Sequence, residues 1–156
     1  MNPDPAAEML FGDVLAQARE LWIRAMAQRL SAMGFEDYRR SDPLVMRSLR
    51  SGEVPLGSLT MTLGLTRQGA RKVVSRLGER GYARVTSSTV DSRRRIVQLT
   101  PRGREYLNAV VQTLRALNDE VVANVDEEQL SAAFSVLEFI RDEIAASPPR
   151  KVELAT

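Results

Sequence analysis

The sequence of 156 residues predicts a mainly α-helical fold with one small β-hairpin, which places it in the α+β class. Two observations indicate this class. Apolar residues recur every three or four positions through most of the chain, which is the helical period, and the period falls to two around Val85 and Val97. The length supports one domain with a sizeable core, or a small domain with an added oligomerisation element.

The first predicted helix is long and ends at Gly34. It follows the Asp-Pro pair at 4–5, where a carboxylate can accept from a free N–H and the φ of proline suits the first helical turn. Its apolar surface is wider than a surface helix usually buries. The same Asp-Pro signal at 42–43 predicts the cap of a short second helix, which closes near Gly52.

The segment 55–82 is predicted to form a helix, a tight turn and a second helix. Pro55 opens the first, the turn lies at 64–65, and Thr66 caps the second, which runs to about Arg80. One face of the second helix is apolar, with Ala70, Val73, Val74 and Leu77. The other face is polar, with Gln68, Arg71, Lys72, Ser75 and Glu79.

Two strands are predicted after Gly81, which suits a left-handed residue at the helix end. The polar stretch between them is turn-prone, so the expected product is a β-hairpin, or wing, with arginines at its tip. Thr100 then starts another helix of about 24 residues, roughly 36 Å long, which outruns a small core. Asp126 and Gln129 form a capping box for a last helix with two apolar faces, which implies two neighbours.

The charge of the chain is unevenly distributed. Residues 66–104 carry eleven Lys or Arg against two acids, a balance of +9, while the net charge of the whole chain is +2 and the remainder therefore carries −7. Such a local excess is the electrostatic footprint of binding to a polyanion, above all nucleic acid. A merely solvated basic face is the alternative.

Several functional classes are excluded or disfavoured by composition. The chain has no Cys and no His, which removes disulfides, thiol redox sensing, imidazole bases and the usual zinc sites. We therefore expect no metal and no cofactor. No apolar run approaches the roughly 18 to 20 residues of a membrane span, and the start is acidic rather than basic, so we expect a cytoplasmic protein without membrane contact.

The helix beginning near Thr66 is a candidate reader of DNA, because the major groove admits an α-helix whose first turns meet base edges. Glutamine can pair bidentately with adenine and arginine with guanine, and the N–H groups at the helix start favour a phosphate. The predicted major-groove residues are Thr66, Arg67, Gln68, Arg71, Lys72 and Ser75. The predicted wing residues, placed to reach the minor groove, are Asp91, Arg93, Arg94 and Arg95, with Asp91 bracing an arginine.

Two runs together resemble the MarR family of bacterial transcriptional regulators: L-T-R-Q-G-A-R-K-V-V-S-R-L-G-E-R-G-Y at 65–82 and D-S-R-R-R-I-V-Q-L-T-P-R-G at 91–103. The resemblance covers almost the whole chain. It implies a winged helix-turn-helix homodimer joined through its long first and last helices, base contacts from Gln68 and Arg71, and minor-groove insertion of Arg93 held by Asp91. The wing departs from the family at 86–90, T-S-S-T-V, where relatives commonly carry an Arg and a Pro-bearing acidic turn.

The resemblance also implies a domain plan and a type of regulation. The parts are a dimerisation helix at 1–35, a winged helix-turn-helix domain at 36–100, dimerisation helices at 101–147 and a tail at 148–156. Family members are most often repressors of pseudo-palindromic operators, and many release DNA on binding a small aromatic or anionic molecule in a cleft. Here Trp22, Tyr38, Arg39 and Arg40 could line such a cleft, although a helix aromatic is more often core material.

Two other functional classes compete with the regulator. One is a winged-helix protein-interaction module whose basic face binds an acidic partner. The other is an enzyme, which ranks last because no His or Cys is present and no two acids have a spacing that suggests a shared site.

Overall fold

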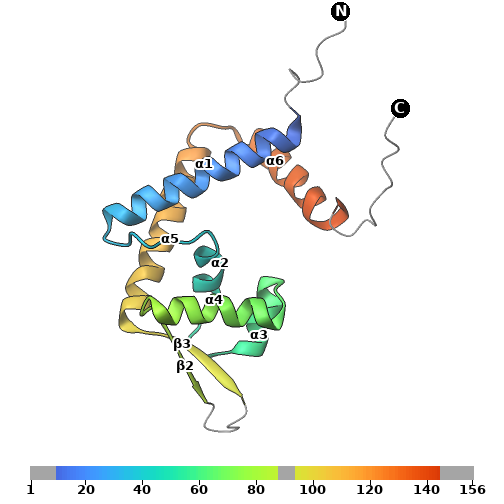
Figure 1. The fold of residues 1–156 in the computed structure, drawn as a ribbon. Coiled ribbons are helices and arrows are strands. Elements are labelled where there is room, and N and C mark those ends of the chain that lie inside the picture. The colour runs from blue at the N-terminus through green and yellow to red at the C-terminus, as the bar shows by residue number, and fades with distance from the viewer. Residues whose placement is uncertain (1–9, 88–93, 145–156) are drawn as a thin grey trace, which may run out of the picture. The chain divides into compact units, whose positions relative to one another are not determined.

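The computed structural model describes residues 10–87 and 94–144. The helices are α1 (Phe11–Ala32), α2 (Asp42–Ser48), α3 (Leu56–Leu63), α4 (Arg67–Glu79), α5 (Pro101–Val122) and α6 (Glu127–Phe139), followed by a π-helical turn, Ile140–Ile144 (Figure 1). The strands are β1 (Val54–Pro55), β2 (Ala83–Ser87) and β3 (Arg95–Leu99). The predicted fold class, mainly α with a small β component, is confirmed. The chain divides into two compact units, Met1–Arg115 and Ala116–Thr156.

Helix α1 ends where the sequence predicts. Gly34 adopts a φ of +87°, and the N–H of Phe35 returns to the carbonyl of Leu30 at 2.9 Å, which closes the helix end. The predicted start at residues 4–5 lies outside the described residues. Only two residues of α1, Met26 and Leu30, are fully buried.

Helix α2 corrects one prediction. Asp42 was expected to cap this helix, but it is the first helical residue, and Ser41 occupies the cap position without a side-chain bond. The Asp42 carboxylate accepts instead from the N–H of Arg39 at 2.9 Å and from side chains of distant elements. The sequence signal was local, whereas the partners of this buried carboxylate lie far along the chain.

Helices α3 and α4 form the predicted helix-turn-helix. Gly64, with a φ of +59°, ends α3, and the hydroxyl of Thr66 caps α4 by accepting from the N–H of Gly69 at 3.1 Å. Ala70, Val74 and Leu77 on α4 are buried. The polar residues between them therefore face outward, as their spacing predicts.

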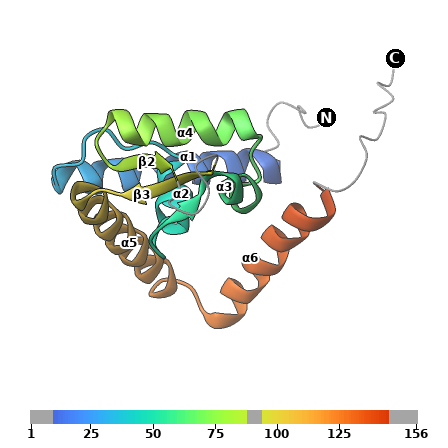
Figure 2. The ribbon, with the colours of Figure 1, turned by 90° about the horizontal axis from the view of Figure 1, so that it is seen from below.

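The strands form one antiparallel sheet in the order β1-β3-β2, with Val85 opposite Val97 and Val54 also opposite Val97. β1 was not predicted. Seen from below, α4 runs along one side of the strands, while α3 and α5 lie near their ends (Figure 2). This arrangement places the wing strands beside α4.

The start of α5 is fixed against the end of α4. Thr100 Oγ1 accepts from the N–H of Gly103 at 3.0 Å and donates to the carbonyl of Gly81 at 2.6 Å, and its N–H donates to the carbonyl of Tyr82 at 3.0 Å. A Cβ at Gly103 would overlap that same carbonyl. The L-T-x-x-G sequence is thus a close-packed corner between β3 and α5.

The core of the first unit draws on helices α1 to α5 and on the sheet. Its fully buried residues include Met26, Leu30, Val45, Met46, Leu49, Leu59, Ala70, Val74, Leu77, Tyr82, Val97, Tyr106 and Val110. None of the helices in the described part of the chain is both long and apolar enough to cross a membrane.

The second unit contains the end of α5 and helix α6. Asp126 and Gln129 make the predicted capping box, with the N–H of Gln129 donating to Asp126 Oδ1 at 2.7 Å. No residue of α6 is buried, although Phe134, Leu137 and Phe139 are large and apolar. The π-helical turn that follows was not predicted.

Candidate nucleic-acid interface

Helix α4 presents a polar face to solvent at its first turns. The buried face fixes the rotation of the helix, so Arg67, Gln68, Arg71 and Lys72 are all exposed. The cap made by Thr66 leaves the other N–H groups of the first turn directed outward, where they favour an anion. The exposed residues and the helix N-terminus lie at the same end of α4.

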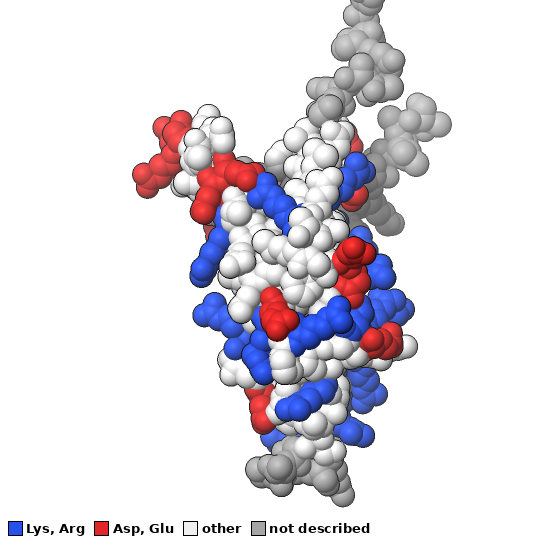
Figure 3. All heavy atoms as spheres, turned by 90° about the vertical axis from the view of Figure 1, so that its left-hand side faces the viewer, with Lys and Arg blue, Asp and Glu red and all other residues white. Residues whose placement is uncertain are grey.

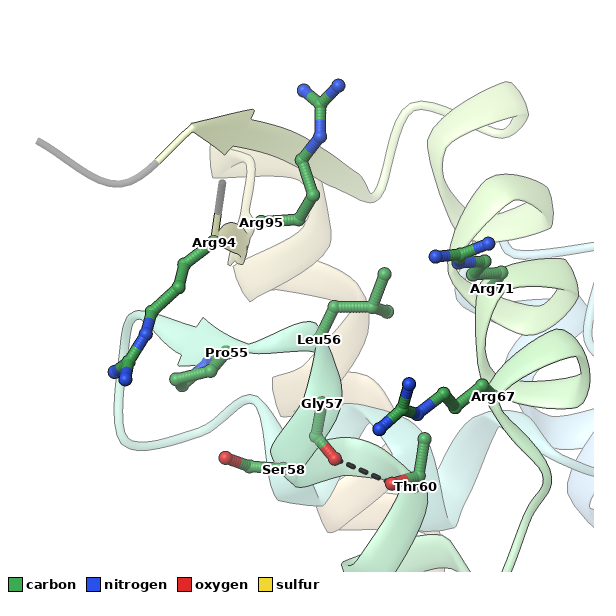
Figure 4. A pocket seen from close by; sticks show the side chains of 9 residues that line it. All are labelled: Pro55, Leu56, Gly57, Ser58, Thr60, Arg67, Arg71, Arg94 and Arg95. Atoms are coloured by element: carbon green, nitrogen blue, oxygen red, sulfur yellow. Dashed lines mark hydrogen bonds between the residues drawn. The ribbon is translucent and has the colours of Figure 1, made fainter. Parts of the chain in front are cut away.

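A hollow of about 410 Å³ lies between α3, α4 and the start of β3. The residues that line it are Pro55, Leu56, Gly57, Ser58, Thr60, Arg67, Arg71, Arg94 and Arg95. Arg67 and Arg71 project from α4 toward α3, while Arg94 and Arg95 come from the other side and point in different directions (Figure 4). Four guanidinium groups from two separate elements therefore surround one concave surface.

The electrostatics of this hollow favour an anion. No acidic residue is among those that line it. Within the described ranges, Arg67 and Arg71 form no ion pair, and Arg95 makes only a long contact of 3.5 Å to Ser87 Oγ. On a different face of the molecule, Lys and Arg side chains gather over the middle and lower part, with some Asp and Glu among them (Figure 3). Guanidinium groups in this arrangement suit the phosphates of a duplex.

The sequence-predicted site residues divide into three groups. Thr66, Arg67, Gln68, Arg71 and Lys72 lie together on the exposed start of α4. Ser75 lies farther along the same helix and donates to Glu79 Oε1 at 3.1 Å, so its hydroxyl already has a local partner. Of the four wing residues, Arg94 and Arg95 line the hollow, whereas Asp91 and Arg93 lie outside the described residues.

Several of the basic residues within 66–104 have partners inside the protein, among them Arg80, Arg102 and Arg104. Arg80 turns inward to Asp42, with N–O distances of 2.7 and 3.0 Å, and Arg104 donates to the carbonyl of Leu99 at 3.1 Å. The guanidinium of Arg102 lies 5.5 Å from the ring centre of Tyr82. The local excess of charge in the sequence therefore overstates the charge that is offered to a ligand.

The surroundings of Arg80 perturb three ionisable groups. Burial raises the pKa of Asp42, while hydrogen bonds and charge from Tyr106, Arg80 and Arg39 oppose that rise. Burial also raises the pKa of Tyr82 to about 12, reinforced by its hydrogen bond to Asp37. The pKa of Tyr106 is raised by burial and by its bond to Asp42. Residue types and spacing gave no signal of this cluster, because its members are far apart in the sequence.

The residues that were predicted to line an effector cleft lie on α1 and on the segment before α2. Burial raises the pKa of Tyr38, the charge of Asp42 adds to the rise, and the charge of Arg19 opposes it, so the Tyr38 hydroxyl lies within electrostatic reach of α1. Trp22, one turn after Arg19, is about one-third exposed. Arg39 is exposed. The part of the chain that is described contains no cluster of acids that could hold a metal ion.

A scan against protein-family models found no match, and a search of curated proteins found none either. Solved structures do match. FabT from Streptococcus pneumoniae in complex with DNA has a TM-score of 0.73 at 16% identity, covering 86% of this chain and 94% of that chain. A mutant MarR from E. coli complexed with operator DNA has a TM-score of 0.68 at 18% identity, covering 83% and 91%.

The PcaV transcriptional regulator from Streptomyces coelicolor in complex with its natural ligand is similar over 92% of this chain and 99% of that chain, with a TM-score of 0.68 and 22% identity. These likenesses extend over nearly the full length of each known structure. The chain therefore has the winged helix-turn-helix fold of the MarR-type transcriptional regulators.

Proposed function

We propose that this chain is a sequence-specific DNA-binding transcriptional regulator that acts as a homodimer, with repression as its mode of action. The observation that carries the proposal is the arginine-lined hollow beside the exposed start of α4. A polyanion is the ligand that such a surface suits, and an α-helix with Gln and Arg at its first turns is suited to base edges.

In the proposed complex, α4 lies in the major groove with Gln68 and Arg71 on bases. The N-terminal N–H groups of α4 and Lys72 meet phosphates. The wing lies at the adjoining minor groove, where Arg93 and Arg94 enter and Asp91 holds the inserted arginine; for Asp91 and Arg93 the support is the sequence alone. MarR and FabT, which have similar structures, were solved in complex with DNA, and this supports DNA as the ligand.

The proposed homodimer joins two copies through α1 and α6. Both helices expose large apolar side chains, among them Phe11, Leu21, Trp22, Phe134 and Phe139. The second unit has only Leu117 buried among its described residues, so it has no core of its own and needs another surface to cover its apolar residues. A second copy supplies such a surface and pairs two α4 helices for a pseudo-palindromic operator with half-sites about 10 base pairs apart.

A mobility-shift titration of the region upstream of the gene tests the proposal. We expect a shifted complex at low salt, a footprint with two half-sites, and an affinity that falls steeply as salt rises, because several phosphates are contacted per protomer. Arg93→Ala should weaken this binding. The proposal fails if no duplex from that region binds more tightly than random DNA, and retention on an acidic protein but not on DNA would favour a protein-interaction module instead.

A small aromatic or anionic effector is proposed to bind near Trp22, Tyr38 and Arg39, and the solved complex of PcaV with its natural ligand supports the idea. Trp22 is the single tryptophan of the chain, so its emission reports on that region alone. Titration with a panel of aromatic carboxylates should quench Trp22 and release bound DNA over the same concentration range. Quenching without release, or release that survives Arg39→Gln unchanged, would contradict the assignment.

A further inference from the structure

Arg80, at the end of α4, is enclosed by the protein rather than offered to DNA. Its side chain is 13% exposed, and its two terminal nitrogens lie 3.0 and 2.7 Å from Oδ2 of Asp42, which is 3% exposed. The same oxygen accepts from the Tyr106 hydroxyl at 2.7 Å and from the N–H of Arg39 at 2.9 Å. A buried ion pair of this kind persists only when further hydrogen bonds surround it.

Aromatic rings and a second carboxylate complete the enclosure. The guanidinium carbon of Arg80 lies 4.9 Å from the ring centre of Tyr82 and 5.8 Å from that of Tyr106, and these two rings stack at 4.3 Å. Asp37 Oδ2 lies 3.5 Å from Arg80 Nε, and Asp37 Oδ1 accepts from the Tyr82 hydroxyl at 2.6 Å. The last turn of α4 is thus attached to α2, to α5 and to the segment after α1.

Because α4 is held at its last turn, the position of its first turn depends on the tilt of the helix. α4 has 13 residues, so it is about 20 Å long, and a tilt of about 10° at Arg80 would move its first turn by about 3 Å. Hydrogen bonds to base edges tolerate much smaller errors, since a functional group must be placed within about 0.5 Å. The contacts of Arg80 are therefore far from the proposed DNA site, but they determine where the first turn of α4 is placed.

We propose that Arg80, held by Asp42 and Tyr106, is a positioning residue of the DNA interface. It sets the tilt of α4, and with it the places of Gln68 and Arg71 on the bases, without touching DNA. The inference rests on the proposed DNA-binding function. Its competitor is the role that the sequence pattern suggests for any arginine in this segment, a direct phosphate contact or a solvated charge.

Asp42→Asn separates these roles by the sign of its effect. The substitution removes a negative charge, so charge alone predicts equal or tighter binding to DNA. Positioning predicts the opposite, because an uncharged amide oxygen holds the guanidinium of Arg80 more weakly than a carboxylate does. We expect Asp42→Asn to lower the ratio of specific to random-duplex affinity by about tenfold, the value of one lost base contact.

Salt dependence separates the roles a second time. A lost phosphate contact reduces the slope of log affinity against log salt by about one. Arg80→Gln should weaken specific binding by about tenfold while leaving this slope unchanged. Arg80→Lys keeps the charge but loses the two-pronged geometry, so it should also bind weakly. Arg76→Gln is the matched control, because Arg76 lies one turn earlier on α4 and is exposed.

The experiment is fluorescence anisotropy on the full chain with two duplexes of equal length, one footprinted upstream of the gene and one random, over a salt series. Circular dichroism melts set a temperature at which every variant is folded. Tyr106→Phe keeps the ring stack and loses only one hydroxyl, so it tests the same contact even if the other variants fail to fold. We expect it to lower the ratio of specific to random-duplex affinity severalfold.

Tighter or unchanged specific binding by Asp42→Asn, or a reduced salt slope for Arg80→Gln, would overturn the positioning role and leave the proposed function standing. Absence of specific binding by the wild-type chain would overturn both. A lowered ratio of specific to random-duplex affinity for Asp42→Asn, Arg80→Gln and Tyr106→Phe would support the proposal, provided that Arg76→Gln leaves this ratio unchanged.

Discussion

Arginines of one helix carry the same charge and have different roles. Arg67 and Arg71 project from α4 into the hollow, whereas Arg80 is buried against Asp42 at the end of the same helix. Burial of the apolar face of α4 decides which arginines point outward, and a carboxylate 38 positions away decides the place of Arg80. The role of a charged residue therefore follows from its place on the helix.

Base reading by Arg71 can be tested with variants of one base pair at a time. Arg71→Ala should relax the preference at a single position of each half-site by about 1 to 3 kcal/mol, because a bidentate contact to guanine is lost. Competition binding against a set of singly substituted operators measures this effect. Arg76→Ala serves as the control and should lower all affinities alike; a uniform loss for Arg71→Ala as well would refute the base contact.

The tyrosines predict a dependence of stability on alkaline pH. All three, Tyr38, Tyr82 and Tyr106, have a pKa raised above 10, and that of Tyr82 reaches about 12. Between pH 10 and 12 the unfolded chain loses these protons and the folded chain keeps them, so the free energy of unfolding falls as pH rises through this window. Below pH 10 the contribution is fully present.

Chemical denaturation at a series of pH values, with tyrosinate absorbance as a second signal, measures the effect. We expect little tyrosinate at pH 10 in the folded protein and its appearance together with unfolding. Tyr82→Phe should flatten the fall in stability between pH 10 and 12. Ordinary titration of all three tyrosines near pH 10 in the folded chain would contradict the burial of their hydroxyl groups.

Secondary-structure elements join at corners whose packing explains the sequence motifs. The corner at Thr100 and Gly103 brings the start of α5 so close to the carbonyl of Tyr82 that no side chain fits. A side-chain hydroxyl is needed at Thr100 because it both donates to the carbonyl of Gly81 and accepts from the N–H of Gly103. The motif is thus a packing requirement of the corner.

Gly103→Ala should destabilise the chain by about 1 to 3 kcal/mol or more, since the added Cβ overlaps backbone that cannot move freely. Gly57→Ala is the matched control: it is also a helical glycine, but nothing lies within 4 Å of a Cβ added there. For this control we expect no loss, and a gain of up to about 1 kcal/mol. Equal effects of the two substitutions on urea midpoints would show that the corner is not close-packed.

The elements that the sequence predicts are stabilised by neighbouring residues, whereas those that it misses depend on residues far along the chain. Caps such as Thr66 and Asp126 act over three residues, so α4 and α6 could be predicted from neighbouring positions. β1 has two residues and contains Pro55, and it is a strand only because β3 provides an edge to pair with. The Asp-Pro pair at 42–43 predicts a cap, but the partners of Asp42 are Arg80 and Tyr106. These residues are 38 and 64 positions away, so no pattern of neighbouring residues indicates them.

The candidate site shows the same division between local and distant causes. The exposed start of α4 followed from its helical period, and Arg94 and Arg95 were placed near it by the hairpin. The contribution of α3 through Ser58 and Thr60 had no signal in the sequence, because it depends on how α3 and α4 pack. Packing between elements is the information that spacing along one element does not carry.

At the scale of the whole molecule, the two units of the chain differ in the surfaces that they expose. The basic hollow lies in the first unit, while α6 in the second unit exposes large apolar side chains on one side and is acidic at its start, with Glu127 and Glu128. The proposed function accounts for this difference, because a surface that meets phosphate is best cationic and one that meets a second copy is best apolar.

Leu137→Glu should therefore convert the proposed dimer to monomers. Leu137 is an exposed apolar residue of α6, and a charge at an apolar interface would be left unpaired. Sedimentation velocity over a range of concentrations gives the oligomeric state. Ser131→Glu is the control, since Ser131 lies on the polar side of α6 beside Glu127 and Glu128; an unchanged dimer in both variants would exclude this face as the interface.

The corner between α4 and α5 also has a mechanical consequence. Thr100 bonds to two successive carbonyls, those of Gly81 and Tyr82, and Gly103 leaves no gap beneath them, so the joint has no slack. A shift of the start of α5 would therefore be transmitted to the residues that follow α4 rather than absorbed at the corner. No further element is required between α5 and α4, because the corner that fixes the end of α4 also moves with the start of α5.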